Sequence, residues 1–199
     1  LHDTLEVTSR RGPFELTCDD PAVPVDDRNL VTRAAHALWS ALGRAGEPRG
    51  VAIHLTKHIP MQAGLGGGSS DAASALSALA RLWRFRRPPA ELAVIASRLG
   101  SDVPFFLVGG TALGLSRGED LYPLEDLPPW FVVLALPGFG VATADAYRWF
   151  DADGPLAAGQ SGVGRLAEVG AIVEAVVAAV TDRPIRADAT ARPPLVEPA

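Results

Sequence analysis

The sequence contains little cysteine, little lysine and no long apolar run, and each shortage excludes a class of protein. The single cysteine, Cys18, leaves no internal disulfide to form, which favours a cytoplasmic setting. No run of about 18 apolar residues is present, so no membrane span is predicted. The net charge of −5 comes without a basic stripe, which argues against nucleic acid as a partner. Lys57 is the only lysine in the chain.

Apolar residues, by contrast, are plentiful. The chain has 199 residues and 48% of them are hydrophobic, which is enough for one large domain or two small ones with cores of their own. It begins at Leu1 rather than at a methionine, and its first residues resemble the interior of a strand. We therefore expect a fragment, or a chain whose natural N-terminus lies upstream.

Apolar periodicity and turn residues predict an alternation of strands and helices. The expected strands are residues 5–8 and 14–18, on either side of a turn at 10–13, followed by 51–56, 111–115 and 131–136. The expected helices are residues 30–43, 68–83, 88–99, 144–150 and 164–181, and residues 182–199 are expected to be disordered. In the second of these helices a core stripe is predicted at Ala72, Leu76, Leu79 and Leu82.

A glycine-rich segment lies between the strand at 51–56 and the helix that follows it. Residues 64–70 hold four glycines and two serines, and each glycine costs conformational entropy on folding. Such a loop exposes backbone N–H groups, and the helix N-terminus adds roughly half a positive charge. This arrangement predicts an anion site for phosphate. The alternative is a glycine-rich turn that binds nothing.

The spacing of these glycines excludes the commonest phosphate loops. No lysine follows them, so the Walker pattern fails. Gly64 and Gly66 fit the dinucleotide fingerprint, but its sixth position is Ser69 rather than glycine. The His-Arg-Asp and Asp-Phe-Gly motifs of protein kinases are absent.

The segment KHIPMQAGLGGGSSDAA (57–73) resembles the second motif of the GHMP kinase superfamily of small-molecule kinases. Its triple glycine and Ile-Pro are most similar to the branch that phosphorylates 4-diphosphocytidyl-2-C-methyl-D-erythritol in the non-mevalonate (MEP) isoprenoid pathway. Further similar segments are RNLVTRAA (28–35), LGSDVPFFLVGGTALGLSRGE (99–119) and LPGFGVATADAY (136–147).

The resemblance implies an α+β fold of two domains with the active site in the cleft between them. An ATP-binding domain would span residues 1–118, and a partial C-terminal α/β sandwich domain would span residues 119–199. The implied reaction is transfer of the ATP γ-phosphoryl group to the 2-hydroxyl of the cytidyl substrate, with Mg²⁺ bridging phosphate oxygens. The chain would be a cytoplasmic monomer or homodimer.

The resemblance also implies roles for single residues. Asp102 would be catalytic and contact the substrate, together with Thr143 and Tyr147, whose ring would stack on cytosine. The implied nucleotide-binding residues are Asn29, Lys57, Pro60, Gly64, Leu65, Gly66, Gly67, Gly68, Ser69 and Ser70. No residue is assigned as a metal ligand.

Simpler interpretations stay open for several of these residues. Asp102 could cap the helix that follows it, and Asn29 could be only a helix cap. Lys57 could be a solvated surface lysine, and Tyr147 could pack a short helix onto the core. Asp71 is expected to favour the helix N-terminus rather than to touch a metal.

The sequence departs from the family pattern at three places. It begins downstream of the first motif, whose lysine works with the catalytic aspartate, and no C-terminal glycine motif is found after residue 150. Ser116 stands where the family usually has glycine. Loss of one electrostatic partner costs roughly two to three orders of magnitude in rate, so a weakly active or inactive chain is expected. The alternatives are a nucleotide-binding fragment without catalysis, a fragment that cannot complete its core, and a kinase of the homoserine or mevalonate type.

Overall fold

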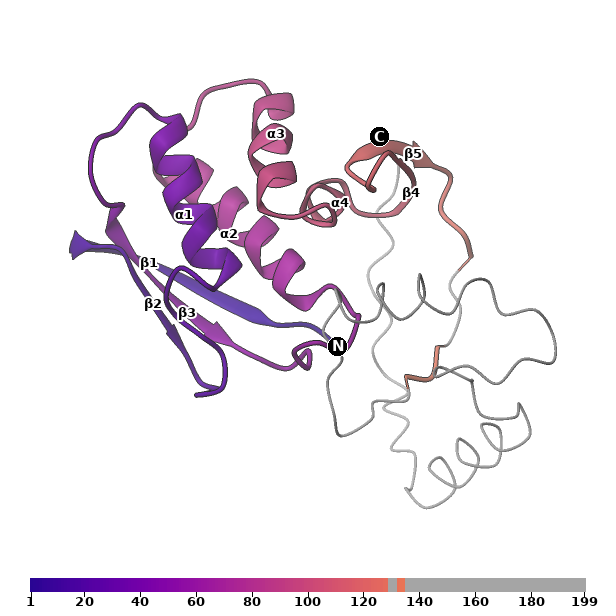
Figure 1. The fold of residues 1–199 in the computed structure, drawn as a ribbon, viewed down its shortest axis with the longest axis horizontal. Helices are drawn as coiled ribbons and strands as arrows, with labels where there is room; N and C mark the ends of the chain where they lie inside the picture. Colours follow the sequence, from indigo (N-terminus) through magenta and orange to yellow (C-terminus); the bar gives the residue numbers. More distant parts are fainter. Residues whose placement is uncertain (129–131, 135–199) are drawn as a thin grey trace, which may run out of the picture. The chain divides into compact units, whose positions relative to one another are not determined.

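The computed structural model describes residues 1–128 and 132–134, and residues 1–128 belong to one structural unit (Figure 1). Its strands are β1 (Thr4–Pro13), β2 (Glu15–Cys18), β3 (Arg49–Thr56), β4 (Thr111–Leu115) and β5 (Asp120–Leu124). Its helices are α1 (Leu30–Ala41), α2 (Gly67–Leu82), α3 (Pro89–Leu99) and α4 (Val103–Val108). The predicted helices at 144–150 and 164–181, the tail, Thr143 and Tyr147 lie outside the described residues.

The first three strands form one sheet with the order β1-β3-β2. β3 pairs antiparallel with β1, from Thr4 opposite Thr56, and parallel with β2. The two strands predicted at 5–8 and 14–18 are confirmed as β1 and β2, but the turn predicted at 10–13 is wrong, because β1 continues through Pro13 with a register shift after Ser9. β3 takes the central position because every second side chain in it is apolar and fully buried.

Helices α1 and α2 pack against each other over one face of this sheet (Figure 1). The predicted core stripe of α2 is confirmed at Ala72, Leu76 and Leu79, which are at most 1% exposed. It is wrong at Leu82, which is 39% exposed. The helix ends at Leu82, and the ring of the next residue, Trp83, fills the core in its place with 7% exposure.

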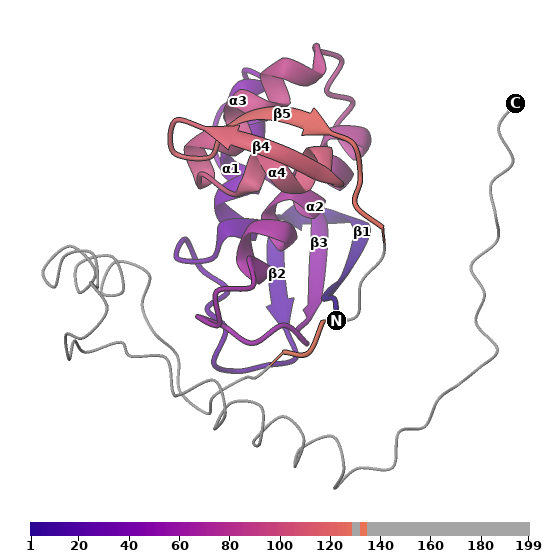
Figure 2. The same ribbon diagram turned by 90° about the vertical axis from the view of Figure 1, so that its right-hand side faces the viewer.

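A short hairpin follows the helices. β4 and β5 pair antiparallel, with Leu115 opposite Asp120, and Figure 2 shows the hairpin beside α4. The predicted domain boundary at residues 118/119 falls in the turn of this hairpin and stays a prediction. Of the strand predicted at 131–136, only residues 132–134 are described, and they are exposed and not in a strand.

The turn of the hairpin places residue 116 in a backbone conformation that favours glycine. Ser116 has a φ of 60°, in the left-handed region that disfavours residues with a Cβ, and its hydroxyl donates a hydrogen bond to Asp120 at 2.7 Å. We expect Ser116→Gly to be more stable than Ser116→Ala by about 1 kcal/mol, because alanine keeps the strain and both lose the hydroxyl. Urea unfolding of the two variants measures this difference, and equal midpoints would contradict it.

Candidate active site

The glycine-rich loop leaves the end of β3 and enters α2 through two left-handed glycines. Gly64 has a φ of 70° and Gly66 a φ of 69°, which residues with a Cβ rarely adopt. A Cβ at Gly66 would lie 2.7 Å from Cζ of Phe106 on α4. Glycine is therefore required at position 66 both by the backbone angle and by the close approach of this ring.

The first turn of α2 presents its backbone N–H groups at the end of this loop. The N-cap residue, Gly66, has no side chain to satisfy them, and the first helical hydrogen bond runs from the Ser70 N–H to the Gly66 carbonyl at 2.9 Å. The N–H groups of Gly67, Gly68 and Ser69 precede this bond and have no partner within the helix. They form the positive end of a 16-residue helix, as an anion site requires.

The three consecutive glycines of this turn face different surroundings. Gly67 is buried, and a Cβ there would lie 2.8 Å from Cγ2 of Ile59 and 3.0 Å from Nζ of Lys57. Gly68 is exposed, and a Cβ there would meet only Leu30, at 3.9 Å. The hydroxyl of Ser70 donates to the Gly67 carbonyl at 2.8 Å. The helix therefore packs closely through Gly67, while Gly68 lies on its open side.

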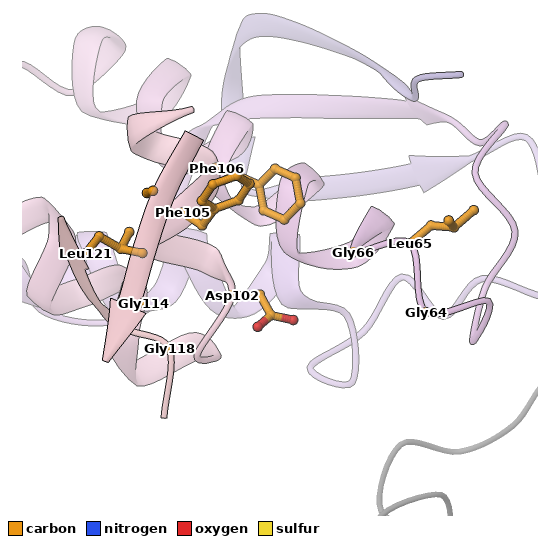
Figure 3. Close-up of a pocket in the computed structure, with 10 residues that line it drawn as sticks. Gly64, Leu65, Gly66, Asp102, Phe105, Phe106, Gly114, Gly118 and Leu121 are labelled. Carbon is orange, nitrogen blue, oxygen red and sulfur yellow. The ribbon is translucent and has the colours of Figure 1, made fainter. Parts of the chain in front are cut away.

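Asp102 lies between α3 and α4, and its carboxylate points into the space between the glycine-rich loop and the β4–β5 hairpin (Figure 3). The side chain is exposed and makes no capping hydrogen bond to α4, although it holds the N-cap position. Val103 and Pro104, which follow it, are buried and anchor the turn. The interpretation of Asp102 as a simple helix cap therefore lacks the bond that it requires.

One cavity of about 380 Å³ brings Asp102 and the loop together (Figure 3). It is lined by Gly64, Leu65 and Gly66 on one side and by residues of the hairpin, among them Ala112 and Leu121, on the other. Phe105 and Phe106 line it as well, so one wall of the cavity is aromatic. Because Phe106 touches Gly66, the position of α4 and its aspartate is linked to the position of the loop.

Lys57 is not the solvated surface lysine considered above. Its side chain is 6% exposed, and its ammonium binds the carboxylate of Asp3 and, at 3.0 Å, that of Asp71 in α2. The other oxygen of Asp3 accepts the backbone N–H groups of His58 at 2.6 Å and Ile59 at 2.8 Å. The prediction that Asp71 serves the helix N-terminus is also wrong, because its buried carboxylate faces Lys57.

The two carboxyl groups of this cluster titrate in opposite directions. Burial raises the pKa of Asp71 to about 6, and the nearby charge of Asp3 adds to this against the opposing effect of Lys57. Burial also acts to raise the pKa of Asp3, but the hydrogen bonds from Ile59, Lys57 and His58 outweigh it and lower the pKa overall. For Lys57, the two carboxylates overcome the effect of burial and raise the pKa. Asp71 is therefore the group that takes up a proton first on acidification.

Replacement of Asp71 by asparagine should make stability less dependent on pH. The folded chain binds the proton of Asp71 more tightly than the unfolded chain does. The stability that this proton contributes is therefore fully present below about pH 4 and is lost as the pH rises through about 6. We expect the difference in free energy of unfolding between Asp71→Asn and the natural chain to shift in favour of the variant as the pH rises from 4 to 8, because asparagine carries no group that loses this proton. Urea unfolding between pH 4 and 8 measures it, and a difference that is constant over this range would disprove the expectation.

The remaining predicted site residues have the following places. Asn29 caps α1, as one interpretation held: its side chain accepts the Val31 N–H at 2.8 Å and donates to the Pro24 carbonyl at 2.7 Å. Pro60 is exposed at the start of the loop. The nucleotide contacts predicted for these residues stay predictions. Asp3 was missed, because nothing in the sequence marks it as a partner of Lys57, which lies 54 positions further along the chain.

Within the described part of the chain, no group of three or more histidine, cysteine, aspartate or glutamate side chains is arranged to hold a metal ion. In the same part of the chain, no helix combines the length and the apolar character that crossing a membrane requires.

Comparison with known proteins agrees with this geometry. Residues 29–110 match the family described as GHMP kinases N terminal domain. The chain is 48% identical over 153 residues to a 4-diphosphocytidyl-2-C-methyl-D-erythritol kinase of Deinococcus radiodurans, a match that covers 76% of this chain and 50% of the relative. The chain spans about half the length of the curated relatives it matches.

Solved structures give the same result. A crystal structure of a 4-(cytidine 5'-diphospho)-2C-methyl-D-erythritol kinase is similar with a TM-score of 0.56 and 38% identity, over 89% of this chain and 59% of that one. A homoserine kinase from Cytophaga hutchinsonii shares the fold, with a TM-score of 0.53 and 22% identity over 89% of this chain and 56% of that one. The predicted family and the predicted α+β fold are thereby confirmed.

Proposed function

Since this chain belongs to the GHMP kinase family, we propose that it acts in transfer of the γ-phosphoryl group of ATP to the 2-hydroxyl of 4-diphosphocytidyl-2-C-methyl-D-erythritol. The relatives that it matches at 42–48% identity have this kinase name. This reaction would be one step of isoprenoid precursor synthesis in the cytoplasm.

The observation that carries the proposal is that Asp102 and the glycine-rich loop line the same cavity. Phosphoryl transfer needs a site for the phosphates of the donor and a group that orients the attacking hydroxyl. The exposed carboxylate of Asp102 would accept the proton of that hydroxyl or hold it in line. Phe105 and Phe106 line the same cavity and give it an aromatic wall.

The loop suits the triphosphate of ATP. Gly67 packs so closely that a Cβ would collide with Ile59, and the N–H groups of the first turn of α2 point out of the helix. Residues from Gly64 to Ser70 would hold the phosphates through these groups. Bound magnesium would neutralise charge on the phosphate oxygens. We assign no protein ligand to this ion.

The other contacts are proposed from the family resemblance. Asn29, Lys57 and Pro60 are proposed to lie near the nucleotide, and Thr143 and Tyr147 near the cytidine. Asn29 is proposed to lie near the nucleotide while its side chain also caps the N-terminus of α1. The ammonium of Lys57 is already bound by two carboxylates. We therefore propose that Lys57 lies near the nucleotide without using its charge to bind it.

The test is a kinase assay on the purified chain with Mg-ATP and a panel of acceptors. The panel contains the cytidyl substrate, L-homoserine and mevalonate, and the product is followed by transfer of labelled γ-phosphate. We expect at most slow phosphorylation, in keeping with the missing family motifs, and of the cytidyl substrate only. Phosphorylation of another acceptor would replace the proposed substrate. A chain that binds Mg-ATP and transfers nothing would be the nucleotide-binding fragment considered above.

A further inference from the structure

Three charged side chains from separate parts of the chain meet in the buried cluster described above. Asp3 precedes β1, Lys57 follows β3, and Asp71 lies in the second turn of α2. Their side chains are only 2%, 6% and 5% exposed. A buried cluster of this kind is weak support for stability as such, because removing charges from water offsets most of their attraction. Its position is therefore more informative than its energy.

The cluster lies at the base of the glycine-rich loop. One oxygen of Asp3 accepts the N–H groups of His58 and Ile59, which are the last residues before the loop turns away. Its other oxygen binds the ammonium of Lys57, and this ammonium also binds Asp71, which follows the loop. Figure 1 shows the N-terminus of the chain beside the connection from β3 to α2. Asp3 thus joins the entry of the loop to its exit through Lys57.

A second contact closes the same base. The side chain of Ile59 lies against Gly67, where even a Cβ would come within 2.8 Å of it. Between these two residues the chain contains two left-handed glycines and Gln62, which has a φ of 56°. A segment with this much backbone freedom does not hold one conformation by itself, because fixing it costs conformational entropy. Contacts at its two ends must therefore restrict it.

We propose that Asp3, Lys57 and Asp71 are positioning residues that clamp the two ends of the glycine-rich loop and hold it in its anion-binding form before a ligand arrives. Asp3 fixes the backbone at the entry, and Lys57 transmits this constraint to α2. None of the three needs to touch the phosphates for this. The consequence for Mg-ATP rests on the proposed function, whereas the clamp itself can be observed in the loop.

The test compares Asp3→Ala with Glu6→Ala as a matched control. Glu6 is an acidic residue in β1, three positions after Asp3, and its side chain is exposed. In Asp3→Ala, amide hydrogen exchange across residues 60–68 should rise about tenfold or more, while a peptide from α3 stays unchanged. The Kd for Mg-ATP should rise by about the same factor. Glu6→Ala should leave both quantities as in the natural chain.

Two further variants keep the test independent of a folding failure. Asp3→Asn retains an oxygen for the two N–H groups but not the charge, and should give a smaller rise in exchange. Asp71→Ala should raise exchange in the same peptide. Combined with Asp3→Ala it should add less than its separate effect, because both act through Lys57.

The outcomes separate the clamp from the proposed function. Unchanged exchange in residues 60–68, or an equal rise in α3, overturns the clamp whatever the kinase assay gives. A local rise in a chain that binds no Mg-ATP supports the clamp and counts against the proposed nucleotide site. If the increases in exchange caused by Asp3→Ala and Asp71→Ala multiply in the double variant, the two residues do not act through Lys57. That result also overturns the clamp.

Discussion

Replacing Asp102 by asparagine is expected to lower the rate of phosphoryl transfer about 10²–10⁴-fold, because the neutral amide cannot accept the proton of the attacking hydroxyl. Binding of Mg-ATP should not change. The carboxylate is exposed at the cavity and makes no bond to α4 whose loss would disturb the fold. The measurement is transfer of labelled phosphate to the cytidyl substrate, with the Kd for Mg-ATP from calorimetry.

Asp27→Asn serves as the control, since this exposed carboxylate lies on the loop before α1 and lines no part of the cavity. It should leave the rate as it is. A rate that is the same in Asp102→Asn and in the natural chain would remove Asp102 from the reaction. A loss of Mg-ATP binding in Asp102→Asn would instead place this residue in nucleotide binding rather than in the chemical step.

Alanine is expected to have opposite effects at two adjacent glycines of α2. At Gly67 the new Cβ would lie 2.8 Å from Cγ2 and 3.1 Å from Cβ of Ile59, a buried residue whose branched side chain cannot easily move aside. Overpacking of this kind costs about 1–3 kcal/mol and separates the two ends of the loop. Gly67→Ala should therefore be less stable and should lose saturable binding of Mg-ATP.

Gly68→Ala is the matched control for this prediction. Its Cβ would meet only Leu30, at 3.9 Å, and alanine is favoured over glycine inside a helix by about 1 kcal/mol. This variant should be as stable as the natural chain or more so in urea unfolding. If both variants were equally stable, the close packing of the loop base at Gly67 would not exist in solution.

Local patterns in the sequence predicted most of the elements. Alternating apolar residues marked β3, and Asn29 marked the start of α1 through the side-chain bond that the structure contains. Proline at the start of a helical pattern marked α3. These predictions succeed because caps and periodicity depend on residues a few positions apart.

The same reasoning failed where partners are distant in sequence. The insertion of β3 between β1 and β2 depends on which strand buries most apolar surface, not on which strands are neighbours along the chain. Leu82 fits the helical period but lies at the helix end, where Trp83 covers the core in its place. Neither outcome follows from a local pattern.

The sequence by itself determined the glycine-rich loop, its place between a strand and a helix, and the family of the chain. These features could be predicted because the residues of the loop follow one another in the chain. Only the tertiary structure decided what surrounds that loop. It brought Asp102 to the same cavity and buried Lys57 between Asp3 and Asp71. Whether a lysine such as Lys57 is buried in an ion pair or exposed to solvent depends on the side chains that pack against it. Those side chains come from segments that are far apart in the sequence and meet only in the folded chain.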